Sequence, residues 1–257
     1  MVERFGWVRD LPDRRDFVVV HPKAARLPAS VSLLAGMPPV YDQLDLGSCV
    51  GNALAAAVDY TRKKQGLRFM TPSRLFIYWN ARSMEQSTAS DSGCAIRDAM
   101  KTLINQGVCV EAEWPYSEDF SHQPSILAYQ TATRHETLKY ESPLQNLANL
   151  KAGLAAGFPF VFGFSVYESF MSGAVAATGL VPMPIGSESM VGGHAVAACG
   201  YDDLTGDQIF THRPEVPSFL VRNSWGASWG INGYFWLPYT YILDPNLADD
   251  FWQIDLE

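Results

Sequence analysis

The chain has 257 residues, of which 47% are hydrophobic and 18% are charged, and its net charge is −8. It is long and apolar enough for one large domain, or two small lobes, around a core, which argues against a disordered chain. An acidic chain lacks the basic surface that follows a phosphate backbone, so we expect no nucleic-acid partner.

The first ten residues interleave charges with apolar side chains and never form the uninterrupted apolar core of a signal peptide. No later apolar run is long enough for a membrane span. We therefore expect a soluble protein that acts as a monomer and is either cytoplasmic or exported without a recognisable signal peptide.

Residues 1–27 carry charges and prolines without clear periodicity, which predicts an extension laid over the main body. The body begins at Pro28. The prolines of 36–41 forbid helix and favour an extended approach to Gln43.

Apolar spacing of three and four residues predicts that the first half of the body is mainly helical. One helix begins at Cys49, where Ser48 can cap it, and ends at the cations and glycine of 62–66. Further helices are expected from the cap and proline at 71–72, over 96–105, and over 142–157.

Short apolar and β-branched runs after residue 158 predict strands over 160–166, 195–201, 219–222 and 234–237. Residues 203–217 look like a hairpin insertion between two of them. Helices followed by strands predict an α+β fold, with a helical lobe over about 43–140, a β-rich lobe over about 141–257 and a groove between the lobes.

The four cysteines are too few and too scattered for a disulfide scaffold, and no two have metal-finger spacing. Cys94 and Cys109 flank a predicted helix that would hold them beyond disulfide reach. We expect one functional thiol and three structural ones.

Cys49 has the features of a nucleophile. A free thiol has a pKa near 8.5, so its anion needs stabilising, and a helix N-terminus together with an imidazolium from His194 would do so. The Cys49 backbone N–H and the Gln43 carboxamide are natural donors for the oxyanion that forms on an attacked carbonyl. The Asn223 oxygen can fix the His194 tautomer. Trp225 and Trp229 can cover that hydrogen bond.

These residues stand in motifs that resemble the papain family of cysteine peptidases over about residues 28–240. The order Cys, His, Asn and the spacings match. The motifs are Gln43, Gly47-Ser48-Cys49, Trp114-Pro115-Tyr116, Gly193-His194-Ala195-Val196-Ala197, Asn223-Ser224-Trp225-Gly226 and Trp229-Gly230-Ile231-Asn232-Gly233-Tyr234. Four further segments resemble a microbial branch of this family: Phe5-Gly6-Trp7, Asp10-Leu11-Pro12-Asp13, Ser73-Arg74-Leu75-Phe76-Ile77-Tyr78 and the segment from Asp244 to Trp252. We expect a bacterial-type member.

The resemblance implies a two-lobe fold and peptide-bond hydrolysis through an acyl-enzyme thioester, with a peptide or protein substrate and neither a cofactor nor a metal. It also implies that Ser92-Gly93 lies along the substrate backbone, beside Gly193. The second subsite would be an apolar pocket walled by Ala95, Ala195 and part of 162–164, so an apolar substrate residue is expected there.

The sequence departs from the family pattern in several places. Leu46 stands where the family often has a second cysteine, so a local disulfide is missing, which is consistent with a reducing compartment. Val50 replaces the aromatic that usually follows the nucleophile. Leu44-Asp45 replaces the glycine-rich linkage after Gln43. Because only about 27 residues precede the body, the extension is expected either to pack on the first lobe or to lie across the groove as a short inhibitor.

Two other functions use the same residues. An acyltransferase or transpeptidase would pass the acyl group to an amine instead of water. An inactive peptidase-like binding module would need no chemistry. The Asn-Ser-Trp-Gly block and the presence of all four reactive groups favour the peptidase.

Overall fold

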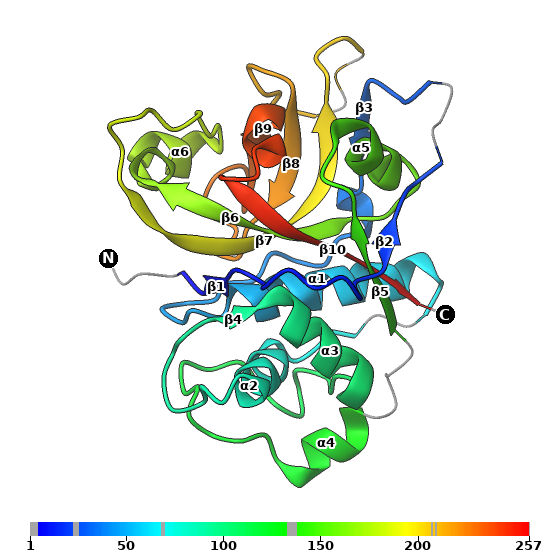
Figure 1. Cartoon of the computed structure of the whole chain (residues 1–257), viewed down its shortest axis with the longest axis vertical. Coiled ribbons are helices and arrows are strands. Elements are labelled where there is room, and N and C mark those ends of the chain that lie inside the picture. The colour runs from blue at the N-terminus through cyan, green and yellow to red at the C-terminus, as the bar shows by residue number, and fades with distance from the viewer. Residues whose placement is uncertain are drawn as a thin grey trace.

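Helix α1 (Cys49–Lys64) runs through the middle of the molecule, with a β-sheet on one side and the other long helices on the opposite side (Figure 1). This computed structural model describes residues 5–22, 26–67, 70–132, 138–206, 208 and 210–256. The architecture is the α+β, two-lobe arrangement that the sequence predicts.

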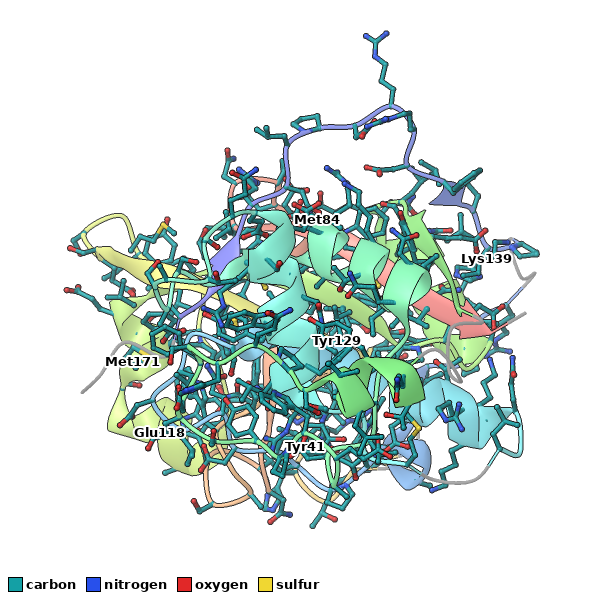
Figure 2. All side chains as sticks on the ribbon, turned by 90° about the horizontal axis from the view of Figure 1, so that it is seen from below. Tyr41, Met84, Glu118, Tyr129, Lys139 and Met171 are labelled. Carbon is teal, nitrogen blue, oxygen red and sulfur yellow. The ribbon has the colours of Figure 1, made fainter. Side chains whose placement is uncertain are left out.

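On one side of α1 lie three further helices and a short strand: α2 (Arg74–Met84), β4 (Cys94–Ala95), α3 (Ile96–Gln106) and α4 (Ile126–Ala132). Tyr129 joins α4 to α2, because its ring centroid lies 5.1 Å from that of Phe76 and its hydroxyl donates to Asn80 Oδ1 at 2.9 Å. Figure 2 shows Tyr129 in the middle of this helical side.

The opposite side is a mainly antiparallel sheet, which among the described residues has the strand order β2-β5-β10-β6-β7-β8-β9, with β3 also paired to β7. Its strands are β2 (Val18–Val19), β3 (Ser30–Ser32), β5 (Leu138–Pro143), β6 (Phe160–Tyr167), β7 (Met190–Asp202), β8 (Ser218–Arg222), β9 (Tyr234–Pro238) and β10 (Ala248–Leu256). Helices α5 (Leu147–Ala155), α6 (Gly173–Thr178) and α7 (Tyr239–Leu243) and the short turns η1 (Leu34–Gly36) and η3 (Glu168–Met171) connect or flank these strands.

The predicted strands over 160–166, 195–201, 219–222 and 234–237 are confirmed. Three of the observed strands are one residue longer, and β7 begins five residues earlier, at Met190. The segment 203–217 joins the antiparallel strands β7 and β8, although its residues 207 and 209 lie outside the described part. Short continuous runs of apolar side chains, nearly all of them buried in β6, β8 and β9, made these strands easy to predict.

Two predicted helix starts are wrong. Helix α2 begins at Arg74 instead of 71–72, because the Ser73 hydroxyl accepts the Phe76 N–H and Pro72 pairs with Val110 instead. Helix α5 begins at Leu147 instead of 142, because residues 142–143 end strand β5 and the Asn146 side chain caps the helix. In both cases a second polar residue further along offers the cap that is used.

Helix α1 can approach the sheet closely because its buried face is rich in small side chains. Every residue from Cys49 to Thr61 is buried. Ala53 and Ala57 share one hydrophobic cluster with Ala195 and Ala197 of β7. None of the described helices has the length and apolarity needed to cross a membrane.

The described part of the N-terminal segment crosses the molecule between the sheet and the helices, where Figure 1 shows it in dark blue. Its strand β1 (Trp7–Val8) pairs in parallel with β4, and β2 pairs in parallel with β5. Residues 1–4 and 23–25 of the predicted extension lie outside the described residues.

A buried cluster of charges fastens this segment. The Asp10 carboxylate accepts the Trp252 indole N–H at 3.1 Å and the Arg97 backbone N–H at 3.3 Å. The Arg97 guanidinium donates to the Leu11 carbonyl and the Asp16 carboxylate. Burial, and then the nearby charge of Asp250, raise the pKa of Asp10 to about 7, while Arg97 and the hydrogen bonds oppose the rise.

The raised pKa of Asp10 predicts stability that is lost with rising pH. The unfolded carboxyl has a pKa near 4, so between pH 4 and 7 the folded state binds more protons than the unfolded state. The stabilisation from this proton is fully present below pH ~4 and is lost as pH rises to about 7. The loss is at most ~4 kcal/mol in the free energy of unfolding. Urea unfolding of the protein and of Asp10→Asn between pH 4 and 8 measures it. The wild type should lose stability relative to the variant across this window. A difference that does not change with pH would contradict the assignment.

Candidate active site

The Cys49 thiol lies at the N-terminus of α1 and is fully buried. The Ala195 backbone N–H points to its Sγ at 3.4 Å, which places the thiol beside strand β7. The predicted side-chain cap from Ser48 does not form. Instead the Ser48 hydroxyl lies 2.5 Å from the Tyr116 hydroxyl and accepts an Asn52 amide hydrogen at 3.1 Å, so it braces the first turn of α1 from the side.

His194 lies on β7, one residue before the amide that contacts the thiol. Its Nε2 is 2.8 Å from Asn223 Oδ1, and the Ser224 backbone N–H donates to the same atom at 2.8 Å. A backbone N–H must meet an oxygen, so the amide orientation is fixed and Nε2 carries the ring proton. The other nitrogen, Nδ1, has no hydrogen-bond partner among the described residues.

Burial controls the charge of both groups. It raises the pKa of the Cys49 thiol to about 11, against smaller opposing effects of hydrogen bonds from the backbone of Ala195, Gly6 and Val50. It lowers the pKa of His194 to about 4, against the hydrogen bond to Asn223. A neutral thiol and a neutral imidazole are therefore favoured in this arrangement.

Aromatic rings enclose the His194–Asn223 hydrogen bond. The Trp225 ring stacks on the imidazole, with centroids 5.0 Å apart and an angle of 28° between the planes. Trp229 meets the Trp225 ring edge-on at 5.2 Å. These rings hold the imidazole at one angle and exclude water from its bond to Asn223.

Gln43 is fully buried and joins the two loops of the site. Its backbone N–H donates to the Ser224 carbonyl at 2.8 Å, and its Oε1 accepts the Ser224 hydroxyl at 2.5 Å. Its Nε2 donates to the Leu46 carbonyl at 2.8 Å. The chain turns after Gln43 because Leu44 takes a φ of 54°, a conformation that glycine adopts more easily, with its N–H bound to Asp42 Oδ1.

Arg74, at the start of α2, holds the Gln43 loop from the helical side of the molecule. The sequence does not identify it as a site residue. Its guanidinium forms an ion pair with Glu111 at 2.5 Å and donates to the Asp42 carbonyl and to Asn52 Oδ1. It also lies 3.9 Å from the centroid of the Tyr116 ring. The sequence feature that could have indicated Arg74 is its place in the 73–78 motif, which resembles the microbial branch of the family.

The N-terminal segment covers this site. The Gly6 backbone N–H donates to the Gly193 carbonyl at 3.1 Å, and the Gly6 carbonyl accepts the Cys94 N–H at 2.8 Å. A Cβ added to Gly6 would lie 1.7 Å from the Gly47 carbonyl oxygen, so only glycine fits there. The Phe5 ring lies 6.4 Å from the imidazole of His194. Cys49 and His194 are buried partly because this segment lies over them.

The structure places the predicted substrate-binding residues around the same segment. Ala95 pairs in register with Val8, and Gly193 accepts the Gly6 N–H. Gly93 lies against Gly6, but its own N–H donates to the Tyr78 hydroxyl, so the neighbouring Cys94 supplies the N–H that meets the segment. Ser92 is exposed. Ala195 lies opposite Gly163 in the β6–β7 register.

The remaining cysteines take no part in this site. All four cysteines, each within the described residues, are free and buried, so the local disulfide is absent as the sequence predicts. Leu46, at the place of the expected extra cysteine, packs in the cluster around α1. No group of His, Cys, Asp and Glu within the described part of the chain is arranged to hold a metal ion.

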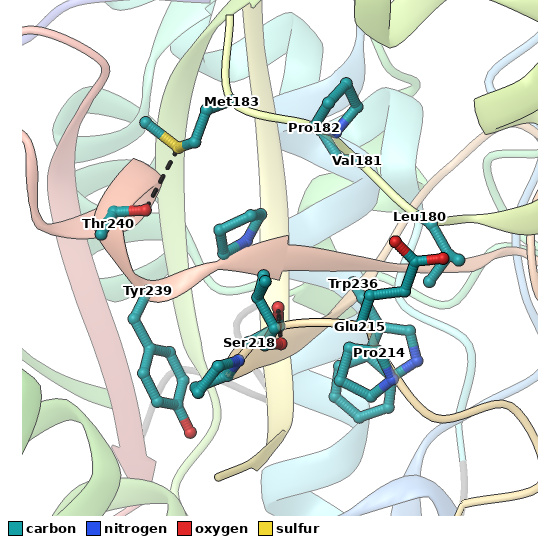
Figure 3. A pocket seen from close by; sticks show the side chains of 13 residues that line it. Leu180, Val181, Pro182, Met183, Pro214, Glu215, Ser218, Trp236, Tyr239 and Thr240 are labelled. Atoms are coloured by element: carbon teal, nitrogen blue, oxygen red, sulfur yellow. Dashed lines mark hydrogen bonds between the residues drawn. The ribbon is translucent and has the colours of Figure 1, made fainter. Parts of the chain in front are cut away.

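A separate open hollow of about 590 Å³ lies away from the thiol (Figure 3). Four prolines, Trp236 and Tyr239 line it, and at one end the Thr240 hydroxyl lies 3.2 Å from the Met183 sulfur. None of the predicted site residues lines it. The candidate site is therefore the cluster around the Cys49 thiol rather than this hollow.

The structure brings together a thiol, an imidazole with a fixed tautomer, the amide that holds this imidazole and a buried carboxamide. This set can carry out attack of a thiol on a carbonyl with proton transfer to a leaving group.

Comparisons with known proteins agree with this geometry. A family model described as papain family cysteine protease matches residues 33–242. The crystal structure of xylellain, a cysteine protease from Xylella fastidiosa, matches this chain with a TM-score of 0.90 and 40% sequence identity. The match covers 100% of this chain and 97% of the xylellain chain. An uncharacterized peptidase C1-like protein of Acanthamoeba polyphaga mimivirus is 39% identical over 97% of this chain and 86% of its own.

A more distant structure shows the fold alone. Digestive procathepsin L2 proteinase from the larval midgut of Tenebrio molitor is 19% identical, with a TM-score of 0.75 over 98% of this chain and 79% of its own.

The Arg74–Glu111 pair predicts a large stability effect. Arg74→Ala would leave Glu111 without its partner, in a pair whose side chains are only 10% and 20% exposed, so we expect a loss of about 3 kcal/mol in the free energy of unfolding, measured in urea. Lys101→Ala is the matched control, because its pair with Asp98 is 36% and 27% exposed and should contribute less than ~1 kcal/mol. Equal losses in the two variants would contradict a bracing role for Arg74.

Proposed function

This chain belongs to the papain family of cysteine proteases and is a cysteine-type endopeptidase, and from this premise we propose that Cys49, His194, Asn223 and Gln43 carry its reaction. The observation that carries the assignment is that Nδ1 of His194 has no hydrogen-bond partner among the described residues. Asn223 holds the ring through Nε2, and the next residue, Ala195, points its backbone N–H at the Cys49 thiol. An unpaired buried nitrogen costs free energy. A role as proton acceptor for the thiol explains why this one is retained.

The proposed reaction begins with transfer of the thiol proton to His194 Nδ1. The sulfur then attacks the peptide carbonyl, and the Cys49 N–H and the Gln43 Nε2 donate to the oxyanion. The carbon–nitrogen bond breaks as His194 returns the proton to the leaving amine. Water, deprotonated by His194, attacks the resulting thioester and releases the acid and the free thiol.

The thiolate–imidazolium pair belongs to the uncovered enzyme in this proposal. Burial of both groups favours their neutral forms while the N-terminal segment lies over them. Entry of water brings the pKa values of the Cys49 thiol and the His194 imidazole back toward their ordinary values. The positive N-terminal end of α1 then favours the thiolate.

Covalent labelling tests the assignment. An epoxide probe for cysteine peptidases should label the protein at one site, and Cys49→Ala should abolish labelling. His194→Ala should slow it about 10²-fold or more, in line with the loss of general-base catalysis. Cys199→Ala is the matched control, since Cys199 is an equally buried free thiol, and it should label normally. Labelling that survives Cys49→Ala would refute the mechanism.

We further propose that residues 1–27 form an extension that inhibits the enzyme by lying across the groove, ahead of a peptidase unit of residues 28–257 with lobes over 43–140 and 141–257. Support comes from the contacts of Gly6 with Gly193, Cys94 and Gly47, and from the charge cluster at Asp10 and Arg97. The end of β10 blurs the lobe boundary, because Trp252 and Ile254 pack in the cluster around α1.

Gly6→Ala tests the extension without deleting any side chain. The added Cβ would meet backbone of Gly47 and should loosen the covered form by ~1–3 kcal/mol, so the rate of probe labelling at Cys49 should rise about 5- to 150-fold. Gly186→Ala is the control, since no atom of the described residues lies within 4 Å of its added Cβ. A folded Gly6→Ala protein that labels at the wild-type rate would show that the extension does not limit access.

Acyl transfer to an amine and a non-catalytic binding module gain no specific support from the comparisons or from the described residues. The substrate of the enzyme is a peptide or protein.

A further inference from the structure

The peptide unit between Leu46 and Gly47 is held at both of its polar ends. Its carbonyl oxygen, on Leu46, accepts a hydrogen from Gln43 Nε2 at 2.8 Å. Its N–H, on Gly47, donates to Asp91 Oδ2 at 2.9 Å. A peptide unit is planar and trans, so its N–H and C=O point in opposite directions and rotate together. A carboxylate that fixes this N–H therefore also fixes the carbonyl to which the Gln43 carboxamide is bound.

The same peptide unit leads directly into the first turn of α1, which begins two residues later at Cys49. On the helix side, the Ser48 carbonyl is fixed by the Asn52 backbone N–H at 3.1 Å and by an Asn52 side-chain hydrogen at 3.0 Å. Asp91 supplies the anchor on the other side of Ser48. Its carboxylate therefore restricts the direction of the Cys49 backbone N–H as well as that of the Gln43 carboxamide.

This loop has little else to fix it. Every cysteine of the chain lies in the described part and is free, and Leu46 occupies the place of the absent second cysteine. Gly47 has the widest choice of backbone conformations, because it lacks a side chain. It also has no room for one, since an added Cβ would lie 3.0 Å from the Phe5 carbonyl oxygen and 3.3 Å from Asp91 Oδ1. The loop therefore needs an anchor that comes from another segment.

Asp91 is itself held by a rigid support. Its Oδ1 accepts the Tyr78 hydroxyl of α2, and this hydroxyl accepts the Gly93 backbone N–H at 3.1 Å. The guanidinium carbon of the fully buried Arg82 lies 4.2 Å from the centroid of the Tyr78 ring. The same guanidinium donates to the carbonyl of Ser90, the residue before Asp91, at 2.8 Å. One buried side chain thus supports both the backbone and the hydroxyl partner of Asp91.

We propose that Asp91 is a positioning residue for the reaction, which acts through the peptide unit of Gly47 to hold the two oxyanion donors, the Gln43 Nε2 and the Cys49 N–H, at the attacked carbonyl. The carboxylate does not touch the substrate in this role. The inference rests on the proposed peptidase function, because it concerns the donors that this function uses. A displacement of about 1 Å in a reacting geometry costs about 10²-fold in rate.

Two reactions of the Cys49 thiol, measured on the full chain, test this role. Cleavage of a fluorogenic peptide passes through an oxyanion, whereas alkylation by iodoacetamide forms a sulfur–carbon bond and releases iodide without one. Asp91→Ala should lower kcat/KM for the peptide about 10- to 100-fold, mainly through kcat, and change the alkylation rate less than about 3-fold. Both reagents must pass the same N-terminal segment, so the ratio of the two rates cancels a change in access.

Two conservative variants distinguish positioning from folding. Asp91→Asn should recover most of the lost cleavage, since its amide oxygen can accept the Gly47 N–H and its NH₂ group can donate to the Tyr78 hydroxyl. Tyr78→Phe keeps the ring against Arg82 and removes one partner of Asp91. It should lower the ratio of cleavage to alkylation, but less than Asp91→Ala does.

Asp119→Ala is the matched control, because it removes an exposed carboxylate whose hydrogen bonds go to Ser121 and His122 of its own loop. It should keep the wild-type ratio. A wild type that iodoacetamide alkylates at Cys49, but that cleaves no peptide, would reject the proposed function together with this inference.

If the wild type cleaves peptides and Asp91→Ala keeps its ratio of cleavage to alkylation, the positioning role alone is overturned. If Asp91→Ala does not fold, Tyr78→Phe decides the question. A wild-type ratio in that variant would overturn the role, and a lowered ratio would support it.

Discussion

The close packing of helix α1 against strand β7 is the constraint on which the rest of the structure depends. Small residues on both elements, such as Ala53 and Ala195, let the helix axis come near the sheet. The thiol at the first residue of the helix then meets the strand that carries His194. A larger side chain at this contact would move the Cys49 thiol away from His194.

The second requirement is that the loops around this contact hold one another. The Gln43 loop and the loop after Asn223 are joined by backbone and side-chain hydrogen bonds through Ser224. The Arg74 guanidinium closes the same loop from the helical side. The carboxamide and the imidazole are therefore placed by one connected network, in which each polar group is oriented by a buried partner.

The N-terminal segment that crosses the molecule connects strand β10 with the surroundings of the thiol. Trp7 and Asp10 both bind the carboxylate of Asp250, while Gly6 passes over the thiol. Burial keeps Cys49 and His194 in their neutral forms under this cover. The contacts that hold the N-terminal segment in place therefore lie next to the thiol and the imidazole.

The sequence by itself determined the family and the residues that we propose to react. Cys49, His194 and Asn223 stand in motifs whose spacing is specific, and the strands around 160–237 follow from local apolar patterns that need no distant partner. Local cap rules misplaced the starts of α2 and α5, since two polar residues competed for each cap and only Ser73 and Asn146 have the right neighbours.

Only the tertiary structure decided what surrounds the thiol. Arg74, Asp10 and Asp250 lie in segments that looked like family phrasing, with no pattern to show that they would meet groups far away in the chain. Strand β10 also depends on distant contacts, because it pairs with β5 and β6. A sequence motif names the groups that can react. Burial and partner geometry, which set their charge and their access to water, arise only when the distant segments pack together.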